Sequence, residues 1–527
     1  MQDDLRFRFP DGTPGDSLRS IIADGYALKA EEPVETTVTY YDTFDWRLFD
    51  KSLVLSRTGD EWVVRRLPTG ATLERLTVGS PPGFVWEIAD SPLKQRVASI
   101  VGARRLLRVG EATIQLAPYR VLNADDKTVA RLLGTKVWAG PFDKLRTSPD
   151  AGAALLDSHV ALFAVRGYSG QFRRLARKFR EAGLAACQWQ ETFERILVAA
   201  GKQPGSYSAK PDYQLQPGTR ADEATKAILR RTLAVMRANE EGIKADWDVE
   251  FLHDYRTALR RTRSALSQIT DVFPPETTKH YKEAFGLLGE RSNRLRDLDV
   301  YLLSEPDYRA MLPDAMREHL APLLNYLRAQ RQQALQEVIG NLNSLPYAAM
   351  MEAWAAFLHE PIPDAPNAPN ATLPIDEVAR RQIDKRYRQV IKDGNQIRDH
   401  TQDELVHALR IDCKKLRYLM EFFASLFPKQ EIDTLIGQLR VLQDDLGAFN
   451  DLSVQRAYLL HLAEVLPAGD AQGKMGLVAI GFLVEKLASG QQELKPRLAK
   501  TFAQFAAAPN RKLFRQLFDT KDRIPDS

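Results

Sequence analysis

Two segments of the sequence share one pattern of histidine and basic side chains. They run from Leu252 to Pro274 and from Val406 to Pro428, and they align without a gap at an offset of 154 residues. The positions that keep a histidine or a cation in both copies are His253, Arg256, Arg260, Arg261 and Arg263 in the first, and His407, Arg410, Lys414, Lys415 and Arg417 in the second. Guanidinium groups donate in pairs to phosphate or carboxylate oxygens, and ammonium groups act as point charges. The repeated pattern therefore predicts an oxyanion-binding surface.

The spacing of these residues places most of them on one side of a helix. Positions i, i+3, i+7 and i+10 fall within roughly 80° of arc when each residue turns about 100°. A charged stripe is often only the solvated face of an amphipathic helix, but such faces usually mix acids with bases. Neither stripe contains a carboxylate at its four positions. We therefore favour a polyanion ligand. Arg261 and Lys415 lie off the main stripe.

The opposite side of each segment is apolar and predicts the core. These residues are Phe251, Tyr255, Ala258, Leu259, Ala265, Leu266 and Ile269 in the first segment, and Leu409, Leu416, Leu419, Met420 and Phe423 in the second. Asp248 is the predicted N-cap of the first helix, and Thr401 to Glu404 spells a capping box before the second. Both segments close on Phe-Pro, which disfavours continuation of a helix.

The repeat extends beyond these two helices. Asp297-Leu298-x-Val300 matches Asp451-Leu452-x-Val454 at the same offset, and Glu290 matches Asp444. These acids either orient neighbouring arginines or form ordinary surface ion pairs. Further basic residues around the repeats are secondary candidates: Arg230, Arg231, Arg237, Arg294, Arg296, Arg380, Arg381 and Arg388. Helix pairs repeated twice predict an all-helical, pseudo-twofold bundle in which the two stripes face a shared groove.

These motifs resemble the CHAD family, named for a histidine-containing α-helical domain. The resemblance rests on HxxRxxxRRxR and HxxRxxxKKxR, each followed by Phe-Pro and an Asp-Leu-x-Val helix, and it covers the chain from about Pro217 onward. It implies two pseudo-symmetric helical halves that bind inorganic polyphosphate through a basic central surface and associate with polyphosphate granules. On this resemblance, the ten histidine and basic residues of the two segments are predicted to contact the ligand.

The first 200 residues have a different pattern. Short alternating runs at 35–40, 61–66, 72–77 and 113–116 predict half-buried strands, and turn signals at 68–70, 80–83 and 123–125 separate them. We expect an antiparallel β sheet or barrel there. The predicted fold class is α+β and multidomain, with this β domain followed by the helical bundle.

Within the β domain, the stretches 40–57 and 165–179 resemble the CYTH family of triphosphate tunnel proteins. That family implies an opening E-x-E-x-K strand whose glutamates hold a divalent metal. The corresponding residues are Asp4, Arg6 and Arg8, and a cation cannot ligate Mg²⁺. We expect a degenerate domain that acts as a scaffold or holds phosphate through Arg6, Arg8, Arg66 or Arg131. The alternative is a metal-dependent triphosphatase or polyphosphatase acting in this domain.

Composition and connections complete the domain prediction. The chain has 527 residues, 44% of them hydrophobic, and a net charge of only +4, so positive charge must be concentrated locally. We expect a β domain at 1–200, a linker at 201–220 and a helical domain at 221–527, with repeats at about 221–359 and 375–527 joined by an exposed loop. The apolar and basic C-terminal segment is expected to pack on its own domain.

The remaining expectations concern partners and location. Cys187 and Cys413 have no metal-ligand spacing, so no metal or other cofactor is expected. The sequence shows no secretory signal and no transmembrane run, which predicts a cytoplasmic protein, at polyphosphate granules and with other granule proteins as further partners. Nucleic acid is the third ligand considered, but the stripes lack interleaved aromatic residues for stacking on bases. The predicted function is non-enzymatic binding of inorganic polyphosphate.

Overall fold

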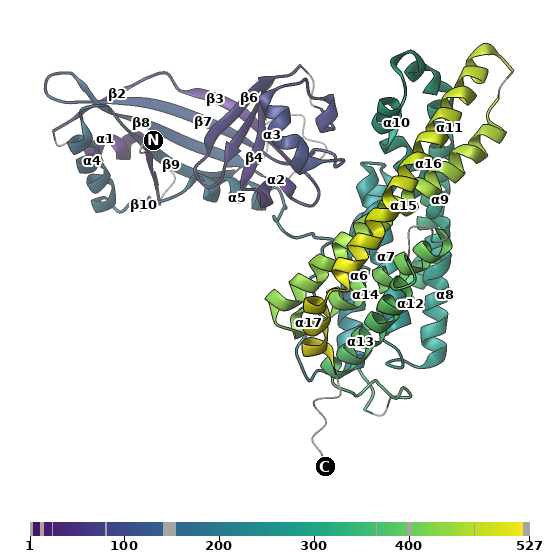
Figure 1. The fold of residues 1–527 in the computed structure, drawn as a ribbon. Helices are drawn as coiled ribbons and strands as arrows, with labels where there is room; N and C mark the ends of the chain where they lie inside the picture. Colours follow the sequence, from purple (N-terminus) through teal and green to yellow (C-terminus); the bar gives the residue numbers. More distant parts are fainter. Residues whose placement is uncertain are drawn as a thin grey trace. The chain divides into compact units, whose positions relative to one another are not determined.

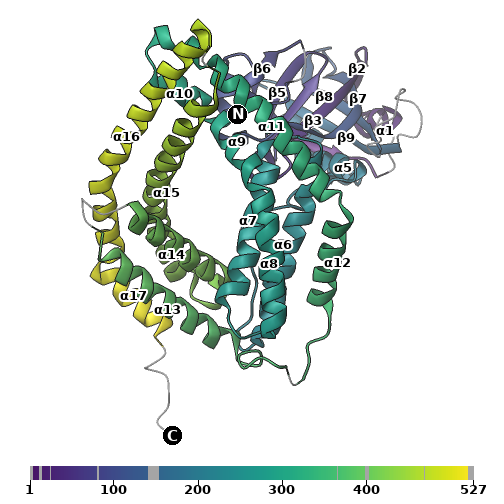
Figure 2. The same cartoon turned by 90° about the vertical axis from the view of Figure 1, so that its right-hand side faces the viewer.

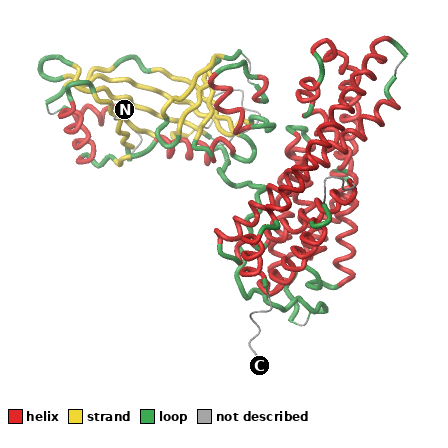
Figure 3. Tube along the Cα trace, in the orientation of Figure 1, coloured by secondary structure: helices red, strands yellow, loops and turns green. Residues whose placement is uncertain are grey.

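A computed structural model shows two compact units, Met1–Ser208 and Ala209–Ser527. The structure describes residues 4–10, 15–23, 25–79, 82–140, 154–364, 366–397, 403–467 and 469–519. An antiparallel sheet dominates the first unit and helices form the second, as Figure 3 shows in yellow and red. The predicted order of a β domain followed by a helical domain is confirmed.

The first unit is built on one antiparallel sheet of ten strands (Figure 1). Its strands are β1 (Asp4–Arg8), β2 (Ala27–Ala30), β3 (Val34–Asp42), β4 (Leu53–Thr58), β5 (Glu61–Arg66), β6 (Ala71–Thr77), β7 (Leu107–Leu122), β8 (Thr128–Ala139), β9 (Ala154–Ala164) and β10 (Ala185–Ala186). The strand order is β10-β1-β9-β8-β7-β3-β4-β5-β6, and β2 pairs with β7. Within the described ranges no pairing joins β6 to β10, so the sheet is open. All four predicted runs lie in strands. Of the predicted turns, residues 80 and 81 lie outside the described residues.

Helices cover both faces of this sheet. Its helices are α1 (Gly15–Ile22), α2 (Arg47–Asp50), η1 (Val85–Glu87), α3 (Pro92–Val101), α4 (Ser169–Glu181) and α5 (Trp189–Ala199). On one face, Val38, Tyr40 and Val54 pack against Phe193 and Ile196 of α5. The opposite face packs on α1 and α4 at one end and on α2 and α3 at the other. Alternate side chains of each strand therefore enter different cores.

The second unit consists of helices, which Figure 2 shows from a second direction. Its helices are α6 (Ala221–Lys244), α7 (Val249–Gln268), α8 (Pro275–Arg291), α9 (Asn293–Leu303), α10 (Glu305–Met311), η2 (Asp314–Leu320), α11 (Ala321–Leu342), α12 (Leu345–His359), α13 (Ile375–Gly394), α14 (Asp403–Phe422), η3 (Ala424–Leu426), α15 (Lys429–Val465), α16 (Ala471–Phe505) and α17 (Ala508–Phe518). Among the described residues, no helix is both long enough and apolar enough to cross a bilayer.

The two repeats fold alike at their centres. Helices α7 and α14 contain the two basic segments and pack against each other. All twelve residues predicted for their apolar faces are buried. Asp248 caps α7 as predicted, because its side chain accepts a hydrogen bond from the Glu250 backbone N–H at 2.9 Å. In the capping box predicted for α14, Thr401 lies outside the described residues.

The repeats differ after the Phe-Pro motif. The first continues as two helices, α8 and α9, which meet at Ser292, whereas the second continues as the single helix α15 of 37 residues. At the break, Arg256 donates hydrogen bonds to the Gly289 carbonyl at 2.9 Å and to the Ser292 hydroxyl at 2.6 Å. The Gly289 carbonyl also accepts from the Ser292 backbone N–H at 3.3 Å and hydroxyl at 3.1 Å, so Arg256 adds a further hydrogen bond at the C-terminal end of α8.

The predicted linker 201–220 is divided between the two units. Its second part packs on helices of the second unit: the Leu215 backbone N–H donates to the Ser425 hydroxyl at 2.9 Å, and the Tyr213 ring lies 5.6 Å from that of Phe422. The loop expected to connect the repeats is also anchored at its end, because the Ala221 N–H donates to the Leu373 carbonyl at 2.9 Å. Both segments hold the starts of the repeats in place.

We predict that Gly242→Ala destabilises the helical unit by about 1–3 kcal/mol, because the added methyl group would overlap the buried ring of Phe251. Gly340→Ala in α11 is the matched control: nothing lies within 4 Å of its added methyl group. It should leave stability unchanged or raise it by up to about 1 kcal/mol. Urea unfolding followed by helical circular dichroism would measure both, and equal midpoints would contradict the predicted contact.

Candidate functional site

The two repeats meet at a pocket of about 320 Å³. Ten of its twelve lining residues form five pairs separated by the repeat offset of 154: Arg256 with Arg410, Arg296 with Asn450, Asp297 with Asp451, Val300 with Val454, and Tyr301 with Gln455. His253 and Arg260 complete the lining. Since each pair contributes one residue from each repeat, the pocket lies on the pseudo-twofold axis. We call it the dyad pocket.

Arg256 is the most constrained cation of the dyad pocket. Beyond its two bonds at the α8–α9 break, it donates to the Asn293 amide oxygen at 2.6 Å. Burial and the charge of the adjacent Arg260 together lower the pKa of Arg256 to about 10, although Asp297 opposes the shift. The guanidinium is thus held rigidly in a place where positive charge is unfavourable.

Cations from both repeats crowd at the α7–α14 contact. Burial and the charge of Arg260 both lower the pKa of Arg410, whereas Asp451 raises it. Burial, together with the charges of Arg410 and Arg260, lowers the pKa of Lys414 to about 8. In addition, Arg296 Nη1 and Arg410 Nε are buried and have no hydrogen-bond acceptor within the described residues. The carboxylates therefore do not neutralise the cluster fully.

Two acids and two histidines lie beside these cations. Asp451 is 3.5 Å from Arg410, and burial raises the pKa of Asp297 while Arg256 and Arg296 oppose that shift. The sequence left open whether these acids orient arginines or form surface ion pairs, and both line the dyad pocket beside its arginines. His253 lines the dyad pocket, whereas His407 is exposed, with its Nδ1 2.7 Å from the Asn450 side-chain oxygen. The two matched histidines therefore occupy different environments.

Five cations of the predicted pattern, Arg261, Arg263, Lys414, Lys415 and Arg417, lie outside the dyad pocket lining. The buried Glu421 lies 3.7 Å from Arg261 and 3.6 Å from Arg417, so it links the two repeats. Arg261 also donates to the Ala209 carbonyl at 2.6 Å. Lys415 pairs with Asp412, and Arg263 lies against α8 near Gly289. Apart from Lys414, these residues contribute to the packing of α7 and α14.

Most secondary candidates also have structural partners. Arg230 donates to the Leu358 carbonyl at 2.7 Å, and Arg380 similarly donates to the Leu517 carbonyl, so each holds the end of a helix. The pairs Arg237–Glu352, Arg294–Glu337 and Arg388–Asp384 are ion pairs at 3.0, 3.2 and 2.7 Å. Arg231 is partly buried and Arg381 is exposed. Only Arg296 of this group lines the dyad pocket.

Sequence reasoning missed Tyr301, Asn450 and Gln455. The ring of Tyr301 stacks on Tyr458 with centroids 4.3 Å apart, and the residue also lines the dyad pocket. Extending the repeat alignment through α9 and α15 would have found all three, because each is a partner in a 154-residue pair. Their side-chain types changed between the copies, which concealed the correspondence.

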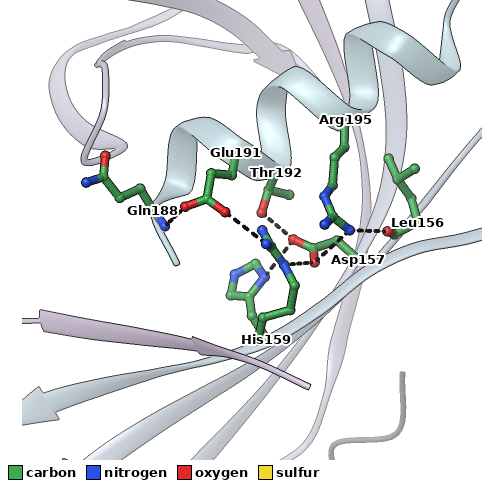
Figure 4. A network of polar contacts seen from close by, with 8 residues as sticks. Leu156, Asp157, His159, Gln188, Glu191, Thr192 and Arg195 are labelled. Carbon is green, nitrogen blue, oxygen red and sulfur yellow. Dashed lines mark hydrogen bonds and ion pairs between the residues drawn. The ribbon is translucent and has the colours of Figure 1, made fainter. Parts of the chain in front are cut away.

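In the sheet unit, the strand that resembles the tunnel motif is tied to α5. Arg8 Nε donates to Asp157 at 2.8 Å, and its Nη1 donates to Glu191 at 2.8 Å. Figure 4 shows the surrounding contacts: the Thr192 hydroxyl donates to Asp157, and His159 Nδ1 lies 3.3 Å from the same carboxylate. Burial by itself would raise the pKa of Asp157, yet these hydrogen bonds and the Arg8 charge lower it overall.

This strand does not fit a divalent metal. Asp4, Arg6 and Arg8 alternate along β1 and so share one face, where Arg6 lies 3.5 Å from Asp4. One carboxylate beside two cations is a poor donor set for Mg²⁺, which requires several oxygen ligands. Among the described residues, no group of three or more His, Cys, Asp or Glu side chains is arranged to hold a metal ion.

Together, the fold and the dyad pocket define a class of protein: an antiparallel sheet unit followed by a pseudo-twofold helical unit with a cationic pocket on its axis. The helical unit carries a CHAD domain, since the model of that family matches residues 227–460. An uncharacterized protein of Mycobacterium tuberculosis is 25% identical over 295 residues, which is 55% of this chain and 53% of that protein. The chain thus spans about half the length of the curated relatives it matches.

Solved structures resemble parts of the chain. The CHAD domain from the plant Ricinus communis is 24% identical, with a TM-score of 0.47, and the match covers 56% of this chain and 97% of that one. A candidate adenylyl cyclase from Hippeastrum, described as having a dominant triphosphatase activity, is 12% identical with a TM-score of 0.26. That match covers 40% of this chain and 100% of the other.

We predict that Arg8→Ala destabilises the sheet unit by about 3–5 kcal/mol, because it removes the nearer cation of the buried Asp157 carboxylate, whose ion pair with Arg195 is longer, at 4.0 Å. Arg6→Ala is the control on the same strand and face, and it should cost less than about 1 kcal/mol because its ion pair is partly exposed. Thermal unfolding of both variants would measure the difference. Equal losses would show that the Arg8–Asp157 contact does not hold the strand to α5.

Proposed function

We propose that the dyad pocket binds inorganic polyphosphate and that the protein acts by binding rather than by hydrolysis. The observation that carries this proposal is the pairing of repeat-related residues around one pocket, where Arg256, Arg260, Arg296 and Arg410 outnumber Asp297 and Asp451. A phosphate chain would supply the missing negative charge and acceptors for the buried guanidinium N–H groups.

The symmetry of the pocket favours a homopolymer. A pseudo-twofold site offers similar donors in both directions, and a linear phosphate chain looks the same from either end. Nucleic acid has a direction and bases, which usually stack on exposed aromatic rings. Tyr301, the aromatic residue of the pocket lining, is only 5% exposed and already stacks within the protein. These features support polyphosphate over nucleic acid as the ligand.

The sheet unit serves as a scaffold in this proposal. Asp157 and Glu191 bind Nε and Nη1 of Arg8, so these two nitrogens are not available to a phosphate group, and Nη2 is buried without a hydrogen-bond partner among the described residues. Association with polyphosphate granules follows from the same ligand, because a granule presents many copies of it. The CHAD resemblance supports both parts of this proposal.

We predict that Arg260→Glu combined with Arg410→Glu lowers the affinity for long-chain polyphosphate at least tenfold. Both residues line the dyad pocket, and within the described ranges Arg260 forms only a local hydrogen bond, to Thr257, so folding should be retained. Lys279→Glu combined with Lys282→Glu, two exposed changes on α8, is the control that matches the net charge of this double variant. Titrations over a salt series should give the wild type a log–log slope of about −3, as expected for four cations. Equal affinity of the two variants would place the ligand elsewhere.

Binding should also depend on pH through Lys414. In the free protein its pKa is about 8, and a bound polyanion would raise it by favouring the charged form. Affinity should therefore be greatest below pH 8 and should fall as the pH rises through the range between the free and the bound pKa. Proton uptake near pH 8.5, measured by calorimetry in buffers of different ionisation enthalpy, should disappear in Lys414→Arg. Proton uptake unchanged by that substitution would contradict this role.

A further inference from the structure

A second cationic pocket lies between α13 and α17, away from the dyad pocket. It has a volume of about 450 Å³ and is lined by four cations, Arg388 and Lys392 of α13 and Arg511 and Arg515 of α17. Its carboxylates are Asp384 and Asp519. We call it the α13–α17 pocket. Its positive charge exceeds its negative charge by two, and its size is within the usual range of ligand sites.

A buried hydroxyl group faces this pocket. Tyr387 is 9% exposed and lines the pocket, and its ring stacks on Phe514 with centroids 3.7 Å apart. Its hydroxyl group is buried and has no hydrogen-bond partner among the residues that the structure describes. Because an unsatisfied buried hydroxyl is costly, its position here points to an acceptor that comes from outside the chain.

The cations around Tyr387 differ in their existing partners. Arg388 pairs with Asp384 at 2.7 Å, and Arg511 donates through Nε to the Ala506 carbonyl at 2.6 Å. Lys392 and Arg515 are exposed and form no ion pair within the described ranges. The charges of Arg511 and Arg515 both act on the Tyr387 hydroxyl. A ligand that accepts a hydrogen bond from the Tyr387 hydroxyl would therefore also contact guanidinium groups. Oxyanions are recognised by this combination of donors.

The corresponding helices of the first repeat, α6 and α12, lack the cations that line this pocket. Helix α6 begins 154 residues before α13, so Arg388 and Lys392 correspond to Ala234 and Ala238. Helix α12 packs on α6 as α17 packs on α13, yet α12 contains neither lysine nor arginine, whereas α17 has Arg511, Lys512 and Arg515. The cations are therefore a property of the second repeat and not a general feature of these helix faces.

We propose that the α13–α17 pocket is a second oxyanion site that binds phosphate groups of inorganic polyphosphate. Tyr387 donates its hydroxyl hydrogen to a phosphate oxygen, and Lys392, Arg511 and Arg515 neutralise the charge. The choice of polyphosphate rests on the proposed function; the oxyanion chemistry of the pocket does not. A chain long enough to occupy both pockets would be held at two points and would gain avidity.

The test uses the full chain and tripolyphosphate as the probe, with stoichiometry measured by calorimetry. Wild-type protein should bind two molecules, and Arg260→Glu with Arg410→Glu should leave one. In that background, Lys392→Glu with Arg515→Glu should remove the remaining site, whereas Lys512→Glu, a control on the same helix outside the pocket lining, should not. Tyr387→Phe should weaken the remaining site about fivefold through loss of one hydrogen bond, without lowering the stability of the free protein.

The outcomes separate the two proposals. If the dyad pocket variant loses all binding, the α13–α17 site is wrong and the proposed function stands. A single site that responds only to Lys392→Glu with Arg515→Glu would overturn the proposed function and keep the second site. A second site that survives those changes lies elsewhere on the chain. Tyr387→Phe with lower stability and unchanged affinity would show a structural role and overturn the assignment of the hydroxyl.

Discussion

Repulsion between cations held together on the pseudo-twofold axis is the interaction on which the rest of the helical unit depends. The packing of α7 on α14 brings Arg260 of one repeat close enough to Arg410 and Lys414 of the other to lower the pKa of both. Like charges that share a partly buried site raise the free energy of the folded state. The apolar cores behind the two helices must offset this cost, and a polyanion would remove it.

The fold separates basic residues that hold the structure from those left for a ligand. Arg261 and Arg417 share the buried Glu421, and Arg230 and Arg380 hold the ends of helices α12 and α17. These contacts fix the two halves against each other. The dyad pocket keeps cations whose neighbouring carboxylates are too few to neutralise them. Rigid placement of such groups lowers the cost of ordering them when a ligand binds.

In the sheet unit, by contrast, the chain's own carboxylates bind the arginine of the corresponding motif. Arg8 occupies a position where the tunnel family resemblance implies a phosphate-binding lysine, but its guanidinium is bound by Asp157 and Glu191. These bonds join β1 and β9 to α5, whose apolar side packs on the same sheet face. An internal ion pair therefore occupies this strand position and anchors the helix. The α13–α17 pocket is different again, since its cations surround a hydroxyl group with no acceptor within the described residues.

The sequence by itself determined the two fold types, the repeat and the apolar faces of α7 and α14, because helical and strand periodicities are local properties. It also gave Arg256, Arg260 and Arg410, which line the dyad pocket, as candidates, since charge retained at a constant offset is visible without coordinates. Only the tertiary structure decided which cations share a pocket. Four other cations are retained at the same offset of 154 residues: Arg261, Arg263, Lys415 and Arg417. Their environment depends on Glu421, Asp412 and α8, which come from other turns or helices. Neutralisation of a charge is a three-dimensional property, so a one-dimensional pattern cannot specify it.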